Sequence, residues 1–328
     1  MAALADFPPW ANLAIQLKQS ALHEHLTESN MITLQCPRLA GVHFAMFACM
    51  ALLPNSIRAA DQTPLPTVQL LKTDDGVAFA LLGEKPKAPA PTLFVFGADM
   101  RGSLLGEDVN HLGRLLIPHG YVCVSLDLPC HGSDVRDGEK AGDLTGWKDR
   151  IVNGENIAAA FTKQFSSVLD HLIQDGITDP QQVAVSGTSR GGFIALHCAA
   201  ADARVKQVIA FAPVTALSAL AEFKDAETHA DVLALSPIHV ADKLVGKQLW
   251  IVMGNDDGRV GTADCLALAL EVIQKSKGKF NPIPVEMRLV SAIGHRLHAV
   301  PTAQYGQLCA PHEEAARWLL LQRNPAAK

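Results

Sequence analysis

The sequence predicts an α/β fold in which one domain is built on a mostly parallel sheet. Strand patterns and helix patterns alternate from residue 92 onward, which is typical of parallel strands joined by crossover helices. Within this alternation one strand runs directly into a helix at Ser189. Of the 328 residues, 48% are hydrophobic and 19% are charged, which supplies enough apolar surface for a single large core.

The individual elements are predicted from short apolar runs and from helical periodicity. Two opening antiparallel strands are expected at residues 68–72 and 77–82. The later elements are expected as strands at 92–96, 121–126, 182–186, 248–253 and 285–290, and as helices at 190–201 and 263–273. Residues 61–328 should form one domain, with small loop insertions near 134–156 and 214–235 that could shape a pocket.

The strand-to-helix turn contains the pentapeptide G-x-S-x-G, within Val-Ser-Gly-Thr-Ser-Arg-Gly-Gly-Phe at residues 185–193. Such a turn forces the serine into a strained backbone conformation that lifts its hydroxyl clear of the sheet. Neighbouring side chains would block that hydroxyl, and Gly187 and Gly191 remove them. The pattern indicates Ser189 as a nucleophile, and an ordinary glycine-rich turn is the alternative.

Two candidate partners for this serine follow later strands. The strand at 248–253 ends in Gly-Asn-Asp-Asp-Gly-Arg-Val, and the strand at 285–290 is followed closely by His295. The carboxyl ends of parallel strands meet at one edge of the sheet, where sites of such folds lie. A serine hydroxyl is a poor nucleophile unless an imidazole takes its proton and a carboxylate orients that imidazole. His295 is the predicted base, and Asp256 or Asp257 is the predicted acid.

With these residues the chain resembles the α/β-hydrolase superfamily, and within it the single-domain dienelactone-hydrolase and prolyl-oligopeptidase-like serine hydrolases, over roughly residues 66–325. The resemblance implies a twisted sheet of about eight strands with helices on both faces. The family acid motif G-x-x-D-x-x-V falls on Gly254, Asp257 and Val260, which favours Asp257 over Asp256. A second similar stretch, Asp-Leu-Pro-Cys-His-Gly-Ser at 127–133, is expected to be structural, so His131 is a poor catalytic candidate.

The resemblance also implies two backbone donors for the oxyanion of an acyl-transfer reaction. One is the amide of Arg190, directly after the nucleophile at a helix N-terminus. The other is the amide of Ala98, in the loop where the family usually has His-Gly and this chain has Phe-Gly-Ala-Asp. A carboxylate at Asp99 would oppose an oxyanion, so pairing with Arg101 or Arg190 is expected.

Other features limit the ligands. Within the insertions, Trp147 and Phe223 are candidate substrate-binding side chains, with a plain surface loop as the alternative. The sequence has neither a C-x-x-C or clustered His/Cys pattern nor a nucleotide-binding glycine motif, so we expect no metal and no cofactor. A net charge of −5 does not favour nucleic acid. The expected partner is a small ester or a short peptide, and the oligomeric state stays open.

Residues 31–60 have the pattern of a secretory signal peptide, with Arg38 before a mostly apolar stretch at 39–53. That stretch is shorter than the about 20 residues that span a bilayer, so no stable membrane span is expected. Residues 1–30 are interpreted as a spurious extension, with translation beginning at Met31. Export to the periplasm or the medium is expected, and a cytoplasmic enzyme with a packed apolar arm is the alternative.

The sequence therefore predicts a serine hydrolase that cleaves a carboxylic ester through an acyl-enzyme on Ser189. A small peptidase or amidase of prolyl-oligopeptidase-like type would use the same residues. A protein that keeps the fold as a non-catalytic binding protein is the alternative from another class.

Overall fold

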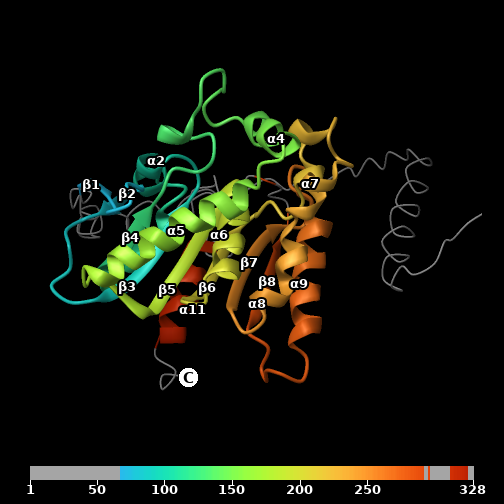
Figure 1. The fold of residues 1–328 in the computed structure, drawn as a ribbon. Helices are drawn as coiled ribbons and strands as arrows, with labels where there is room; N and C mark the ends of the chain where they lie inside the picture. The colour runs from blue at the N-terminus through green and yellow to red at the C-terminus, as the bar shows by residue number, and fades with distance from the viewer. Residues whose placement is uncertain (1–66, 292–294, 296–310, 324–328) are drawn as a thin grey trace, which may run out of the picture. The chain divides into compact units, whose positions relative to one another are not determined.

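A computed structural model describes residues 67–291, 295 and 311–323, and shows one sheet of eight strands (Figure 1). The strands lie in the order β1-β2-β4-β3-β5-β6-β7-β8. Their bounds are β1 Val68–Lys72, β2 Ala78–Leu82, β3 Ala90–Phe96, β4 Val122–Ser125, β5 Thr178–Thr188, β6 Val205–Phe211, β7 Gln248–Gly254 and β8 Val285–Val290.

The sheet is parallel except at its N-terminal edge. β1 pairs antiparallel with β2, and β2 pairs antiparallel with β4, while every pairing from β4 through β8 is parallel. In register, Phe96 lies beside Gly187, Thr188 beside Phe211, and Phe211 beside Val252. The carboxyl ends of the central strands therefore meet at one edge, and the predicted mostly parallel sheet is confirmed.

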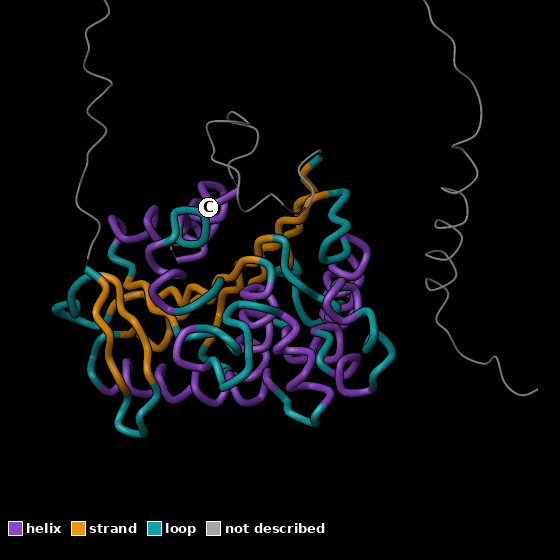
Figure 2. The backbone as a smooth tube through the Cα atoms, turned by 90° about the horizontal axis from the view of Figure 1, so that it is seen from above, coloured by secondary structure: helices purple, strands orange, loops and turns teal. Residues whose placement is uncertain are grey.

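Helices cover both faces of the sheet (Figures 1 and 2). On one face α5 (Ile157–Gln174), α6 (Arg190–Ala201), α8 (Ala241–Leu244) and α9 (Thr262–Ser276) pack in sequence against one another. On the other face α11 (Pro311–Arg323) packs against α3 (His111–Leu116). The short helix α2 (Met100–Leu105) packs near the antiparallel edge, against β2 and β4.

The core lies between the central strands and these helices. Every residue of β3 and β4 is buried, because strands covered on both faces have no solvent side. The rings of Phe94 and Phe165 have centroids 4.7 Å apart, in an edge-to-face contact that stabilises the fold by about 0.5–1.5 kcal/mol beyond its buried area. The buried side chains of α5 recur at helical spacing and include Phe161, Phe165, Val168, Leu169 and Leu172.

The two insertions are folded segments rather than plain loops. The first contains α4 (Leu144–Val152), and the second contains the 3₁₀ turns η3 (Leu217–Ala219) and η4 (Ala221–Phe223) and the helix α7 (Ala230–Ala234). α4 packs against α7 and η4, above the carboxyl ends of the strands (Figure 1). Nζ of Lys148 in α4 lies 2.9 Å from a carboxylate oxygen of Asp225, which joins the two insertions directly.

The first insertion is fastened internally by the buried guanidinium of Arg150. It donates to Glu139 at 2.7 Å and to Asp134 at 2.5 Å. These ion pairs hold the loop before α4 against the helix itself.

None of the described helices is both long and apolar enough to cross a membrane. The expected extension at 1–30 and signal peptide at 31–60 lie outside the described residues.

Candidate active site

Ser189 occupies the turn between β5 and α6, with backbone angles φ 54° and ψ −115°. A positive φ is strained for a residue with a side chain, and here it accompanies the sharp turn from strand to helix. A Cβ on Gly191 would collide with the carbonyl oxygen of Phe96, and one on Gly187 would collide with the backbone of Gly191. The glycines of the pentapeptide are therefore required by the close contact between the turn and β3.

Neighbouring backbone holds the serine in this conformation. The amide of Ser189 donates to the carbonyl of Phe211 at 2.9 Å, and its carbonyl accepts from the amide of Val214 at 3.0 Å. Both partners belong to β6 or the loop after it. The strained turn is thus fixed from the side by the next strand, which positions the hydroxyl at the carboxyl edge.

The structure brings Ser189, His295 and Asp257 together. Oγ of Ser189 lies 3.3 Å from Nε2 of His295, and Nδ1 of His295 lies 3.0 Å from Oδ2 of Asp257. A carboxylate can only accept, so Nδ1 carries the proton and Nε2 presents its lone pair to the serine hydroxyl. This arrangement can remove the serine proton and stabilise the imidazolium that results.

Asp257 and Asp256 occupy different environments. The carboxylate of Asp257 is fully buried, and its Oδ1 accepts the amides of Arg259 at 2.9 Å and Val260 at 3.2 Å. Asp256 is exposed to solvent. The structure places Asp257, and not its neighbour, against the histidine.

The two predicted oxyanion donors also differ. The amide of Arg190 is the first of α6, and the first amides of a helix have no acceptor within the helix. The amide of Ala98 instead donates to Oγ of Ser103 at 3.0 Å, and the amide of Gly97 donates to the same oxygen at 3.2 Å. Ser103 is fully buried on α2. In this structure the Ala98 amide is therefore hydrogen-bonded within the protein, rather than free to bind an oxyanion.

The expectation that an arginine pairs with Asp99 is wrong. Oδ1 of Asp99 accepts the amides of Arg101 at 3.1 Å and Gly102 at 2.9 Å, so the carboxylate caps the N-terminus of α2. A carboxylate in that position is stabilised by the helix dipole and the free first-turn amides. It needs no guanidinium partner.

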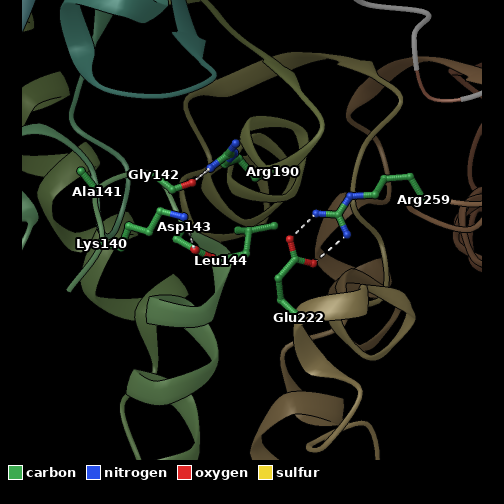
Figure 3. Close-up of a pocket in the computed structure, with 8 residues that line it drawn as sticks. All are labelled: Lys140, Ala141, Gly142, Asp143, Leu144, Arg190, Glu222 and Arg259. Atoms are coloured by element: carbon green, nitrogen blue, oxygen red, sulfur yellow. Dashed lines mark hydrogen bonds and ion pairs between the residues drawn. The ribbon is translucent and has the colours of Figure 1, made fainter. Parts of the chain in front are cut away.

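A pocket of about 350 Å³ lies beside the turn that carries Ser189 (Figure 3). It is lined by residues of the first insertion, of η4, of the start of α6 and of the loop after β7, namely Lys140, Ala141, Gly142, Asp143, Leu144, Arg190, Glu222 and Arg259. The predicted substrate-binding side chains do not line it. Trp147 and Phe223 are both 0% exposed, because the two insertions pack on each other and enclose these rings in the core.

His131 contacts the side chain of Arg190, which lines this pocket. Its Nδ1 lies 2.8 Å from the carbonyl oxygen of Pro129, and its Nε2 lies 3.0 Å from Nη1 of Arg190. Burial lowers the pKa of His131, which keeps the ring neutral with Nε2 as an acceptor. No sequence motif predicts this contact, although the sequence does place Arg190 directly after the nucleophile.

The four cysteines that the structure describes are all buried. Burial raises the pKa of Cys123, Cys130 and Cys265 to about 12, so these thiols stay protonated. Among the residues that the structure describes, no group of three or more His, Cys, Asp or Glu side chains could hold a metal ion.

Residues 146–307 match the prolyl oligopeptidase family (Peptidase_S9). Comparison with curated protein sequences gave no match. Among solved structures, dipeptidyl peptidase 4 of Porphyromonas gingivalis is 18% identical, with 77% of this chain and 35% of that chain covered and a TM-score of 0.56. An acetyl xylan esterase from Paenibacillus sp. R4 is 17% identical, with 79% and 89% covered and a TM-score of 0.55.

A sugar hydrolase from Lactococcus lactis is 14% identical, with 79% of this chain and 99% of that chain covered and a TM-score of 0.57. The chain spans little more than a third of three peptidases that it matches, at 35%, 38% and 36% of their lengths. At these identities the likeness establishes the fold.

Proposed function

We propose that this protein, a serine hydrolase of the α/β-hydrolase superfamily, cleaves a carboxylic ester through an acyl-enzyme on Ser189. The proposal depends most on the hydrogen-bonded chain from Ser189 through His295 to the buried Asp257, with distances of 3.3 Å and 3.0 Å. That chain supplies a nucleophile, a base and a fixed tautomer, which is what acyl transfer from a serine requires.

In the proposed reaction Oγ of Ser189 attacks the ester carbonyl carbon while Nε2 of His295 takes the hydroxyl proton. The bond to the alcohol oxygen breaks, and His295 returns that proton to the leaving alkoxide. Water then attacks the acyl carbonyl carbon while His295 takes a proton from it. The bond between that carbon and Oγ of Ser189 breaks, His295 returns the proton to Oγ, and the carboxylic acid leaves. The Arg190 amide stabilises the oxyanion in both steps, and the Ala98 amide joins it once the oxyanion displaces the Ser103 hydroxyl.

The likeness to esterases supports an ester substrate. The match to the acetyl xylan esterase extends over 89% of that enzyme, whereas the match to dipeptidyl peptidase 4 covers 35%. A second candidate function, a small peptidase or amidase, is supported by the match of residues 146–307 to the prolyl oligopeptidase family. The two functions differ in whether His295 must protonate an alkoxide or an amine.

A fluorophosphonate probe tests the activated serine first. The probe should label Ser189 in the wild-type chain, and Ser189→Ala and His295→Ala should abolish the labelling. Turnover of p-nitrophenyl acetate and butyrate is then compared with turnover of Ala-Pro and Gly-Pro p-nitroanilides. Ester turnover alone supports the esterase, and faster anilide turnover supports the peptidase. A folded protein that is neither labelled nor active is a binding protein with this fold.

We also propose that the enzyme is exported and that residues 31–60 are its signal peptide. The support is the short apolar stretch at 39–53 after Arg38. Intact-mass measurement of the protein isolated from its native host should give a chain that begins near residue 61. A mature chain that still contains residue 31 would contradict the proposal.

A further inference from the structure

We propose that Arg190 selects substrates that carry a free carboxylate, which binds in the pocket beside Ser189. This inference rests on the proposed ester hydrolysis and names the class of ester. The argument depends on how the charges that line this pocket are paired (Figure 3).

Two of the three lining cations have carboxylate partners. Arg259 donates to both oxygens of Glu222, at 2.6 Å and 2.7 Å, and Nζ of Lys140 lies 3.4 Å from Asp143. Arg190 forms no ion pair with any carboxylate among the described residues; its Nη1 donates to the carbonyl of Gly142 at 2.5 Å and to His131. The lining therefore has one positive charge in excess, and that charge is on Arg190.

The guanidinium of Arg190 is held by neutral acceptors, which fix its position without cancelling its charge. Both of its hydrogen bonds within the described chain use Nη1, so Nε and Nη2 have no protein acceptor there. Two neighbouring N–H groups of a guanidinium match the two oxygens of a carboxylate. Burial and the nearby Arg259 lower the pKa of Arg190 and outweigh the opposite effect of Glu222 and Asp143, so an anion beside it would be stabilising.

The position of this charge connects it with the reaction. Arg190 follows Ser189 directly, and Arg259 lies two residues after Asp257, so two of the lining residues are close in the chain to proposed catalytic residues. A volume of about 350 Å³ is at the small end of ligand sites. A single excess charge matches a monoanion such as a carboxylate better than a dianion. The geometry thus fits a small ester that carries one carboxylate.

The carboxylate could belong to the acyl group or to the leaving alcohol, and two substrate pairs distinguish these sources. p-Nitrophenyl hydrogen glutarate is compared with its methyl ester, and 4-acetoxybenzoate with methyl 4-acetoxybenzoate. In each pair the scissile bond is the same, and methylation removes the charge of the carboxylate. The wild-type enzyme should favour the charged member of one pair by at least about tenfold in kcat/KM, as expected for a charge-assisted contact.

Arg190→Gln should bring that ratio close to one, while Arg190→Lys should retain part of it. Lys206→Gln is the matched control, because it removes one positive charge at the start of β6, the end of that strand opposite Ser189, and it should leave the ratio unchanged. Melting temperature and labelling of Ser189 by the fluorophosphonate show that each variant is folded. If Arg190→Gln lowers kcat/KM equally for charged and masked esters, the proposal is overturned, and the side chain of Arg190 has only a structural role.

Binding is measured separately in a Ser189→Ala background, so that a failure of ester hydrolysis does not hide the result. Monomethyl glutarate and monomethyl succinate, together with 4-hydroxybenzoate, are titrated by calorimetry or NMR. At least one should bind, and adding Arg190→Gln should weaken that binding by about tenfold or more. Equal binding with and without Arg190, or no binding of any of these anions, overturns the carboxylate subsite even where neutral esters are hydrolysed.

Discussion

Replacing Asp257 by asparagine should cost far more activity than the same replacement at the adjacent Asp256. In Asp257 one carboxylate oxygen accepts the amides of Arg259 and Val260, and the other accepts Nδ1 of His295. An asparagine can keep the backbone contacts with its carbonyl oxygen, but its NH₂ group then faces Nδ1. Because two donors cannot bond to each other, the imidazole proton moves to Nε2, which can no longer take the proton of the serine.

The same substitution in serine-protease triads lowers kcat by about 10⁴, which corresponds to about 5.5 kcal/mol in barrier. We expect a loss of that order in Asp257→Asn, because the carboxylate is fully buried and water cannot replace it as an acceptor. Asp256 is exposed, and Asp256→Asn should change the barrier by no more than about 0.5 kcal/mol.

The assay is kcat/KM for p-nitrophenyl acetate, with melting temperatures to show that both variants are folded. Fluorophosphonate labelling of Ser189 gives a second measure of its activation. Equal losses in the two variants, or more than a tenth of wild-type activity in Asp257→Asn, would refute the assignment of Asp257 as the residue that orients His295.

Three further predictions concern the scaffold of the site. Asp127 is buried and accepts three hydrogen bonds at 2.8 Å, so Asp127→Ala should lower the free energy of unfolding in urea by about 3–5 kcal/mol; a loss below 1 kcal/mol would contradict this role. Gly191→Ala would drive a methyl group into the carbonyl of Phe96 and should destabilise the protein by about 1–3 kcal/mol and abolish Ser189 labelling, whereas retained labelling would show that the turn can relax. Arg150 holds the pKa of Glu139 at about 2, below its usual 4.5, so this carboxylate stabilises the first insertion fully above pH 4.5 and the contribution is lost as the pH falls toward 2. Tryptophan fluorescence from α4 should follow that loss, and Glu139→Gln should lack this component; an identical acid transition in the variant would show that another group is responsible.

Local patterns predicted the helix after the nucleophile and the strand before the histidine, while the strand before the nucleophile is longer than the expected 182–186. The helix expected at 190–201 and the strand expected at 285–290 have the observed bounds, because glycine turns and apolar periodicity are properties of adjacent residues. The burial of Trp147 and Phe223 was not predictable in this way. It follows from the packing of one insertion on the other, through pairs such as Lys148 with Asp225, which lie far apart in the sequence.

The same limit applies to the groups around the oxyanion. The loop after β3 is visible in the sequence, but whether the amide of Ala98 is free depends on where α2 places the hydroxyl of Ser103. Likewise, a list of arginines does not show which of them lacks a carboxylate partner. Those pairings are set by three-dimensional distances between loops, and they decide the chemistry of the pocket.

Because the Ala98 amide donates to the hydroxyl of Ser103, a substrate oxygen must displace that hydroxyl before it can accept this hydrogen bond. A neutral ester carbonyl gains little by replacing a neutral hydroxyl, since the two acceptors are of similar strength. A tetrahedral oxyanion forms bonds about twice as strong, so it alone gains from the exchange. The hydrogen bond from the Ala98 amide would then form only as negative charge develops on the substrate oxygen. It would lower the activation barrier without strengthening the binding of the ground-state substrate.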